Sequence, residues 1–325
     1  MNEASREIVY VLLWGDLIDT VRGLASVDRI RAAHKRARII LLTTPDYEAL
    51  LKHCPHFSSV ETDALAEGPA GRLMVKRIKI TKPVIVYDLV GDGIARKIKG
   101  GLRFSKTKWI SAAPLAQDGI HPVDAAAATL GRAGLGPDHY KLGAAPGPDI
   151  SWIDYLARSS RMLEPEYFGI NAAFALLAPA GEEVKPALRW PKERWASLAA
   201  QLLDAGVIPA VVGGPSVRDV GRFIAHVTPG ARDLTGKAKL VQLAGLGRRA
   251  CFIFGEDTGL LHLLVAAGPP ALALYPDGDD PALRAPRSAS PVVLMHAQTL
   301  AQVTPDEAMQ AMRYAGGFNE APRAA

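Results

Sequence analysis

The chain has 325 residues, of which 49% are hydrophobic, 22% charged and 6% aromatic, and this composition excludes an intrinsically disordered protein. Its longest apolar stretches, such as Leu260–Gly268, are far shorter than the ~20 residues that a membrane-spanning helix requires, so we expect no transmembrane segment. Two cysteines, Cys54 and Cys251, are too few for a disulfide framework or a cysteine metal site and fit a reducing cytoplasm.

The net charge of +5 is unevenly distributed along the chain. Residues 1–160 contain 22 Lys and Arg against 17 Asp and Glu, whereas residues 161–325 contain 16 of each. The segment Arg72–Lys108 alone has eleven basic and two acidic residues, which indicates an anionic partner: a phosphorylated substrate, an acidic lipid surface or nucleic acid. Nucleic acid is the least favoured of the three, because no aromatic stacking platform accompanies the charges.

Short apolar runs alternate with helical stretches throughout the first half. The expected strands are Ile8–Leu13, Arg38–Thr43, Pro83–Asp88 and Lys108–Ala112. The expected helices are Leu17–His34, Pro45–His53, Gly93–Lys99 and His121–Arg132. Continuous apolar runs separated by helices favour a parallel sheet that is covered by helices on both faces.

The second half repeats this alternation. The expected strands are Ala173–Ala178, Val207–Val212, Ala250–Gly255, Ala271–Tyr275 and Pro291–Met295. The expected helices run from Pro191 to about Gly206, over Val217–His226, over Leu260–Ala267 and from the capping box at Thr304 to about Tyr314. Proline in the first turn marks the start of the first and the last of these helices.

We therefore expect an α/β fold with two doubly wound domains that face each other across a cleft. The N-terminal domain is predicted to span residues 1–160 and the C-terminal domain residues 161–325, with the final helix packing back on the N-terminal domain. In such sheets ligands bind beyond the carboxyl ends of the strands. That rule points to the turns that follow Leu13, Val212 and Gly255.

The strongest functional signal lies in Phe252–His262, where an expected strand ends in a polar turn and a helix begins at once. Free N–H groups at the helix start, with the helix dipole behind them, can hold a phosphate. Gly259 allows a ligand close to the backbone, Thr258 adds a donor, and Asp257 could orient the turn or accept from a ligand. The alternative is simple capping of the helix, with His262 packed in the core. We favour the functional interpretation because the polar groups lie where the topology places ligands.

Three further polar segments have both a functional and a structural interpretation. Asp16, after the first strand, could act as a base or contact a ribose, although spacing alone favours a helix cap. Lys185 and Arg189 could approach a diphosphate or be solvated side chains. Asp277–Asp280 contains a possible magnesium ligand set, but its glycine and a following proline favour an acidic surface turn. No histidine spacing typical of zinc sites and no Walker loop is present.

Four motifs follow one another in the second half of the chain. They are Leu188-Arg189-Trp190-Pro191, Val211-Val212-Gly213-Gly214-Pro215, Asp233-Leu234-Thr235-Gly236-Lys237 and Gly255–Leu263. In this order they resemble glycosyltransferase family 9, the ADP-heptose:lipopolysaccharide heptosyltransferases, over about Ala173–Tyr275. In the N-terminal half, Gly15–Thr20 is similar to the family segment Gly-Asp-(Val/Leu)-(Leu/Ile)-x-Thr.

This resemblance implies a two-domain GT-B fold and an inverting, metal-independent transfer of a heptose or related sugar from an ADP-sugar to a lipopolysaccharide core or a similar anionic acceptor. Asp16 matches the catalytic carboxylate of the family. The implied donor-binding residues are Asp257, Thr258, Gly259, Leu260 and His262, with Lys185 or Arg189 in place of the family lysine. The implied acceptor-binding residues are Arg72, Lys76 and Arg77. We expect no metal and no cofactor, and a cytoplasmic protein that is peripheral on the inner face of the inner membrane.

The chain departs from the family pattern at three places, one of which is a short first loop with Val21 in place of the proline that usually follows its threonine. Leu188 stands where the family has a lysine that meets the donor phosphates, and Asp277–Asp280 adds negative charge near the expected diphosphate. These departures leave two alternatives open: a catalytically impaired homologue that binds a nucleotide-sugar or assembles with a partner, and a glycosyltransferase that acts on protein instead of lipid.

Overall fold

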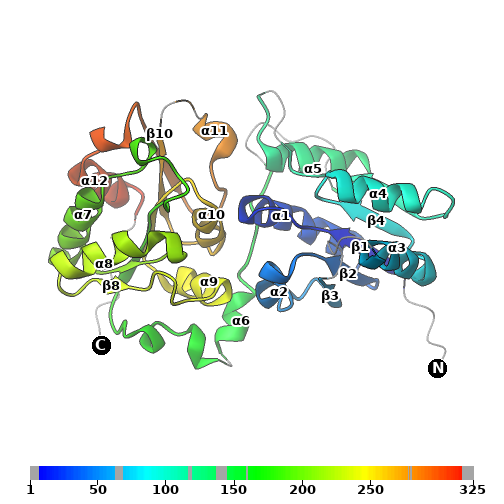
Figure 1. Cartoon of the computed structure of the whole chain (residues 1–325), viewed down its shortest axis with the longest axis horizontal. Helices are drawn as coiled ribbons and strands as arrows, with labels where there is room; N and C mark the ends of the chain where they lie inside the picture. The colour runs from blue at the N-terminus through cyan, green and yellow to red at the C-terminus, as the bar shows by residue number, and fades with distance from the viewer. Residues whose placement is uncertain are drawn as a thin grey trace. The chain divides into compact units, whose positions relative to one another are not determined.

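The computed structural model describes residues 7–62, 69–115, 119–136, 145–158, 160–276, 278 and 280–316. Its internal contacts divide the chain into two compact units, Met1–Pro148 and Asp149–Ala325 (Figure 1). Each unit is built around one parallel β-sheet.

The first unit contains a five-stranded parallel sheet with the order β3-β2-β1-β4-β5. Its strands are β1 (Ile8–Leu12), β2 (Arg38–Leu42), β3 (Ser59–Glu61), β4 (Ile85–Asp88) and β5 (Lys108–Ser111). Its helices are α1 (Leu17–Ala33), α2 (Pro45–Leu51), α3 (Pro69–Thr81), α4 (Gly93–Gly101) and α5 (Pro122–Arg132). The strand order reverses between β1 and β4, and this is the switch point at which doubly wound sheets bind ligands.

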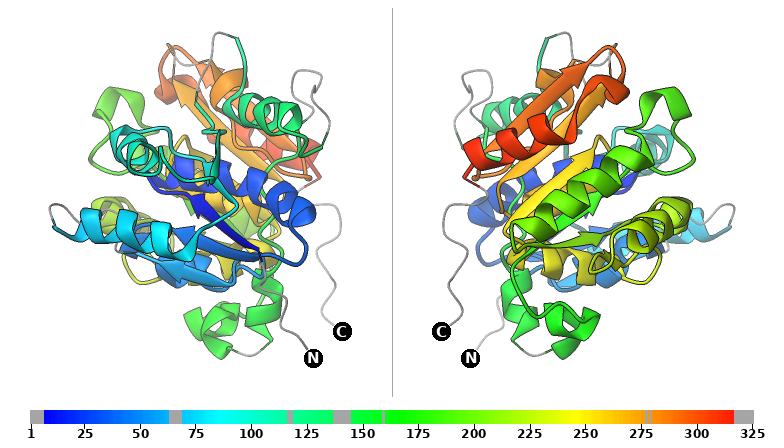
Figure 2. Two further views of the ribbon diagram at one scale, coloured as in Figure 1. Left: turned by 90° about the vertical axis from the view of Figure 1, so that its right-hand side faces the viewer. Right: turned by 90° about the vertical axis from the view of Figure 1, so that its left-hand side faces the viewer.

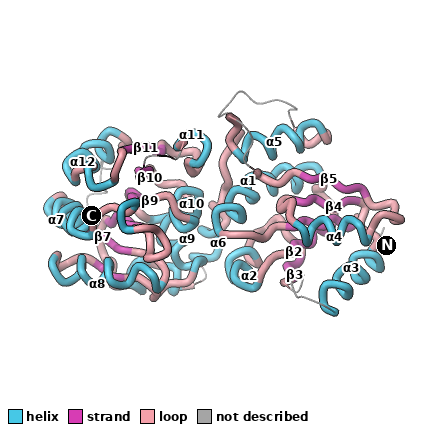
Figure 3. The backbone as a smooth tube through the Cα atoms, turned by 45° about the horizontal axis from the view of Figure 1, so that its top comes forward, coloured by secondary structure: helices cyan, strands magenta, loops and turns pink. Residues whose placement is uncertain are grey.

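Helices α3 and α4 cover one face of the first sheet. Alternate strand residues point to this face because side chains in a strand alternate between its two sides. The buried cluster combines Tyr10, Leu12, Ile40, Leu42 and Val86 of the strands with Met74, Ile78, Ala95 and Ile98 of the two helices. The two helices lie side by side, since a Cβ built on Gly101 would meet Val75 at 2.5 Å (Figure 3).

The second unit contains a six-stranded parallel sheet with the order β11-β10-β9-β6-β7-β8. Its strands are β6 (Phe174–Ala178), β7 (Ile208–Val211), β8 (Arg232–Asp233), β9 (Phe252–Glu256), β10 (Ala271–Pro276) and β11 (Val292–Ala297). Its α-helices are α6 (Ile153–Ala157), α7 (Lys192–Asp204), α8 (Arg218–Val227), α9 (Leu240–Arg249), α10 (Gly259–Ala266), α11 (Pro281–Arg284) and α12 (Pro305–Tyr314).

The second sheet has a hydrophobic core on each face. Helices α7, α8 and α12 lie in front of the sheet in the right view of Figure 2, and they bury Trp195, Leu198, Ile224 and Met312 against the strands. Helices α9 and α10 bury their apolar sides in the second core. Helix α12 belongs to the first of these two cores and packs on α7 and β10 of its own unit.

The fold class predicted from the sequence is confirmed, and the expected strands and helices lie within a few residues of their observed bounds. The helices α3, α6, α9 and α11 and the short strands β3 and β8 were not predicted from the sequence. The many lysines and arginines of α3 mask its helical pattern, although Met74 and Ile78 lie four residues apart on its buried side. No helix among the described residues is long and apolar enough to cross a bilayer.

Candidate functional site

The turn between β9 and α10 lies at the carboxyl edge of the second sheet. Thr258 is the N-cap of α10: its side chain accepts a hydrogen bond from the N–H of Leu261 at 3.3 Å. Its carbonyl accepts the N–H of His262 at 3.2 Å. Gly255 is required just before this turn, because a Cβ there would lie 3.0 Å from the carbonyl oxygen of Ala178. Helix α10 therefore begins where the sequence predicts, and the turn before it is closely packed.

Asp257 is fixed by two side-chain partners, His262 and Arg284. Its Oδ1 lies 3.3 Å from Nε2 of His262, and its Oδ2 accepts a 2.8 Å hydrogen bond from Nε of Arg284. Burial of the carboxylate opposes ionisation, but the hydrogen bonds and charges of His262 and Arg284 outweigh it and hold the pKa of Asp257 below its ordinary value. Asp257 is thus an anchored carboxylate whose side chain is only 6% exposed.

Glu256, the last residue of β9, joins three segments of the second unit. Its Oε2 accepts the N–H of Ala180 and its Oε1 accepts the N–H of Trp190, each at 2.7 Å. The side chain is buried, and burial raises its pKa to about 7 against the opposing hydrogen bonds and the charge of Arg189. Since Ala180 and Trp190 begin and end one loop between β6 and α7, a single carboxylate holds both ends of that loop.

The loop held by Glu256 contains the predicted phosphate ligands. Lys185 is exposed, Arg189 is half-buried and Leu188 is 38% exposed, with a short 3-10 turn at Pro186–Leu188. Trp190, which ends the loop, packs edge to face against Trp195 and Phe254 with ring centroids 5.0 and 5.1 Å apart. The Arg-Trp-Pro motif therefore has a structural role at its tryptophan.

The loops after β6 and β7 meet at the same edge. A Cβ on Gly181 would lie 2.2 Å from Oγ of Ser216, which shows how closely the two loops approach. The loop after β8 is tied to them, since the N–H of Gly236 donates to the carbonyl of Gly213 at 2.8 Å. The motifs that are scattered over the sequence of the second half therefore lie together at the carboxyl edge of one sheet.

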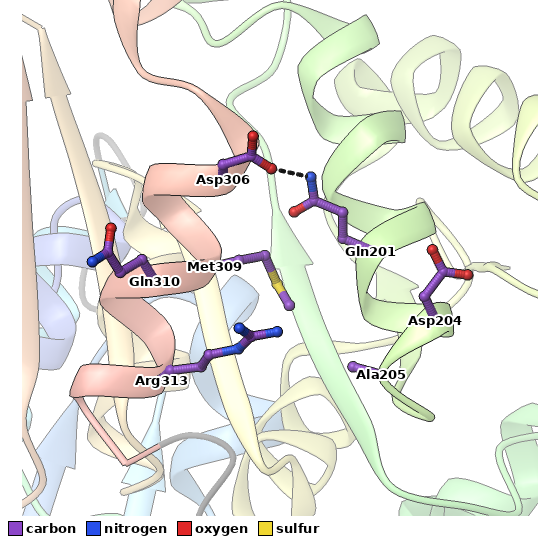
Figure 4. A pocket seen from close by; sticks show the side chains of 7 residues that line it. All are labelled: Gln201, Asp204, Ala205, Asp306, Met309, Gln310 and Arg313. Carbon is purple, nitrogen blue, oxygen red and sulfur yellow. Dashed lines mark hydrogen bonds between the residues drawn. The ribbon is translucent and has the colours of Figure 1, made fainter.

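A cavity of the second unit lies away from this edge. It is lined by residues of α7 and α12, namely Gln201, Asp204, Ala205, Asp306, Met309, Gln310 and Arg313 (Figure 4). A 2.6 Å hydrogen bond from Nε2 of Gln201 to Oδ1 of Asp306 joins the two helices beside the cavity. Because α7 begins at the carboxyl edge and runs away from it, Asp204 and Ala205 lie toward the far end of the helix, and this cavity is separate from the β9–α10 turn.

Asp16 lies at the carboxyl edge of the first sheet, in the turn between β1 and α1. It is exposed and is the N-cap of α1, with Oδ1 accepting the N–H of Asp19 at 2.8 Å. The preceding Gly15 has φ +129°, a backbone conformation that favours glycine. Burial raises the pKa of Asp19, and the charge of Asp16 adds to this effect. Asp16 is therefore both a helix cap and a solvent-facing carboxylate.

Further carboxylates surround this switch point. Asp92 caps α4 through the N–H of Ala95 at 2.7 Å and accepts Nε1 of Trp14 at 2.9 Å. Asp88, at the end of β4, accepts the N–H groups of Val90 and Gly91. The carboxyl edge of the first sheet is consequently rich in carboxylates that accept backbone hydrogen bonds.

The predicted acceptor residues lie on or beside α3. Arg77 forms an ion pair with Glu61 of β3, with 2.9 Å between Nη1 and Oε2, and Lys76 is exposed. The backbone of Arg72 belongs to α3, while its side chain lies outside the part that the structure describes. Arg77 therefore has an ion-pair partner within its own unit.

No group of three or more histidine, cysteine or acidic side chains in the described ranges could hold a metal ion. Asp277 and Asp279 of the acidic loop lie outside the described residues. Asp280 caps α11 by accepting the N–H of Ala282 at 2.9 Å. Helix α11 in turn supplies Arg284 to Asp257, a contact that no motif of the sequence indicated.

Two parallel sheets, each with polar loops collected at its carboxyl edge, define an α/β protein with two Rossmann-like units. The sequence of residues 145–312, just over half of the chain, matches the family model of glycosyltransferase family 9 (heptosyltransferase). The chain therefore belongs to this family, and the family predicted from the sequence is confirmed.

Curated relatives and solved structures agree with this assignment. The chain is 32% identical to lipooligosaccharide heptosyltransferase 2 of Haemophilus influenzae and 33% identical to lipopolysaccharide heptosyltransferase 2 of Escherichia coli K12. Each alignment covers 100 residues, which is 29% of this chain and 29% of the relative.

Solved structures are similar over nearly the whole length. A glycosyl transferase family 9 protein of Veillonella parvula superimposes with a TM-score of 0.77 at 15% identity, over 97% of this chain and 98% of the other. The ADP-heptose LPS heptosyltransferase II of E. coli gives a TM-score of 0.73 at 17% identity, over 94% and 98%. These matches confirm the predicted fold.

Proposed function

We propose that this chain is a glycosyltransferase that moves a heptose or a related sugar from an ADP-sugar to a lipopolysaccharide core or a similar anionic acceptor. The observation that carries the proposal is the β9–α10 turn, where Asp257, Thr258 and Gly259 open a helix at the carboxyl edge of a parallel sheet. The family match and the names of the relatives support the same activity.

The donor diphosphate binds at the start of α10 in this proposal. Backbone N–H groups near Gly259 and Leu260 and the hydroxyl of Thr258 face it, and the helix dipole adds a favourable field. Asp257 and His262 keep the turn in shape through their mutual contact. Lys185 and Arg189 supply positive charge from the loop that Glu256 holds.

The transfer step breaks the bond between the anomeric carbon and the diphosphate oxygen. An acceptor hydroxyl oxygen attacks that carbon from the opposite side, its proton passes to Asp16, and ADP leaves with the bonding electrons, so the configuration inverts. Groups that stabilise the growing charge on the leaving diphosphate commonly contribute a few kcal/mol. We propose that no metal takes part and that Lys76 and Arg72, on the same helix as the Glu61-bound Arg77, lie toward the anionic acceptor, at the inner face of the inner membrane.

Calorimetric titration tests the donor site. The purified protein is titrated with ADP, UDP, GDP and NAD, each with and without magnesium. The proposal expects ADP to bind best, with no dependence on magnesium, and Thr258→Ala to weaken that binding. Preference for another nucleotide, or a strict need for magnesium, contradicts the proposed donor.

Leu188 favours a second candidate function. This exposed apolar side chain occupies the position of the family lysine, so the loop has one cation fewer for a diphosphate. A homologue that binds a nucleotide-sugar without transferring it would have this property. Steady turnover of any ADP-sugar by the purified protein would exclude this candidate.

A further inference from the structure

The loops that lead into the strands of the first sheet are strongly basic. Because all five strands are parallel, every loop from a helix to the next strand lies at the amino edge of the sheet. The exposed cations in or beside these loops are Lys35, Arg36, Arg38, Lys52, Lys79, Lys82, Arg103, Lys106 and Lys108. The described carboxylates toward this edge include Glu7 before β1, Asp28 on α1 and Glu48 on α2, and Asp28 is paired with His56 at 2.8 Å.

Carboxylates gather at the opposite edge of the same sheet, with Arg96 at the start of α4 beside them. Asp16, Asp19, Asp88 and Asp92 all lie at or just beyond the carboxyl ends of β1 and β4. Much of the basic segment Arg72–Lys108 therefore lies at the edge that is remote from Asp16. A role in binding an acceptor beside Asp16 cannot account for these cations.

Exposed apolar side chains lie among the cations at the amino edge. Phe104 is 89% exposed, Ile80 is 69% exposed and Val84 is 40% exposed. Two bonds hold their loops together: Oγ1 of Thr107 donates to the carbonyl of Pro83 at 2.9 Å, and the N–H of Lys108 donates to the carbonyl of Val84 at 3.0 Å. We call this surface the basic corner; it consists of Lys79, Ile80, Lys82, Val84, Arg103, Phe104, Lys106 and Lys108.

Side chains of these two kinds on one surface match the interface of an anionic bilayer. Lipid phosphates attract lysine and arginine, and the region between headgroups and acyl chains accepts phenylalanine and isoleucine. A polyanion such as nucleic acid would bind the cations but would not contact the apolar side chains of Ile80 and Val84. We propose that the basic corner docks on the surface of a bilayer rich in anionic phospholipid, with Phe104 and Ile80 inserted between the headgroups.

Vesicle binding tests this docking surface without any nucleotide, so it is independent of the proposed transferase activity. The purified full chain is sedimented with vesicles of phosphatidylcholine, with and without phosphatidylglycerol. We expect binding only to the phosphatidylglycerol vesicles, and weaker binding as salt increases. Each cation at such a surface is worth about fivefold in partitioning, so Lys82→Glu with Lys106→Glu should reduce it by at least about 25-fold.

The apolar contribution is tested separately from the charge. Phe104→Gln should reduce partitioning on the order of tenfold, whereas Tyr314→Gln, at a side chain that is 91% exposed on α12, should leave it unchanged. Arg222→Glu, on the exposed surface of α8, is the matched control for charge. An unchanged melting temperature shows that each variant is folded.

Three outcomes would overturn the proposal. The first is equal binding to both kinds of vesicle, or to neither. The second is an equal loss of binding in Arg222→Glu and in the basic-corner variants. The third is tight binding to heparin or DNA together with no effect of Phe104→Gln on vesicle binding, which would assign the surface to a polyanion instead.

Discussion

The backbone N–H of Trp190 donates a 2.7 Å hydrogen bond to Oε1 of Glu256, although 66 positions separate the two residues in the sequence. The same carboxylate accepts the N–H of Ala180, so the loop that contains Lys185 and Arg189 is held at both ends. Glutamine at position 256 can accept only through its one oxygen, and its amide group would face the second N–H. The shape of this loop therefore depends on a carboxylate at this position.

Glu256→Gln should weaken ADP binding about tenfold, because one end of the loop is released. The matched control is Glu164→Gln, which alters a partly exposed ion pair with Arg249 in the same unit. Calorimetric titration of ADP into both variants checks this expectation. Equal affinity in the wild type and Glu256→Gln would show that the loop is positioned by other contacts.

Stability should depend on pH through Glu256. Its pKa is about 7 in the folded chain against 4.5 in the unfolded one, so the folded state binds the extra proton between these values. The free energy of unfolding therefore falls as pH rises from 4.5 to 7, by about 3 kcal/mol from this group. Urea denaturation at pH 4 and at pH 8 measures the free energy of unfolding of the wild type and of Glu256→Gln. Between these two pH values, the stability of Glu256→Gln relative to the wild type should rise by that amount. A pH-independent difference contradicts the expectation.

Asp257→Asn should have the opposite pH dependence. The pKa of Asp257 is lowered in the folded state, so its contribution to stability is present above 3.8 and is lost as pH falls through the folded-state value. We expect a loss of about 1–3 kcal/mol at pH 7 that shrinks in acid, because His262 and Arg284 lose a charged partner. Asp204→Asn, on the exposed end of α7, should change little. Denaturant titrations of both variants at pH 7 and pH 3 measure this difference.

Gly255→Ala should destabilise the second unit by about 1–3 kcal/mol, since the new methyl would lie 2.9 Å from Leu261 and 3.0 Å from a backbone oxygen that cannot move away. Gly100→Ala is the control: the space around it is open and it lies in α4, so alanine should be neutral or stabilising by up to about 1 kcal/mol. Melting temperatures compare the two variants. A Gly255→Ala protein as stable as the wild type would mean that the turn relaxes freely.

The separate roles of Asp16 can be distinguished by Asp16→Asn. Asparagine caps helices about as well as aspartate, so the melting temperature should stay within a degree or two of the wild type, as estimated from the small difference between the two caps. Loss of the proposed base should reduce the transfer rate by about 10²–10⁴-fold. Full transfer activity in this variant would show that Asp16 is only a cap.

The sequence predicts the fold well because the strands are short apolar runs and their helices have clear starts, such as Pro191 and the Thr304 capping box. It also places Asp257, Thr258 and Asp16 correctly in the turns that follow strands. It could not reveal the hydrogen bonds of Glu256 to both ends of the loop or the contact of Arg284 with Asp257. Both interactions join residues that are distant in sequence through buried side chains. The charge of Arg72–Lys108 is visible in the sequence, but only the topology shows at which edge of the sheet each cation lies.

The most direct test of the proposed activity is transfer itself, measured as ADP release and as the mass gain of the acceptor. The purified chain is incubated with ADP-heptose and a heptose-free lipopolysaccharide core in the presence of EDTA, beside Asp16→Asn. We predict stoichiometric ADP release and acceptor glycosylation in the wild type, and loss of both in the variant. ADP binding without any transfer would contradict it and would favour a homologue that binds the nucleotide-sugar but does not act on it.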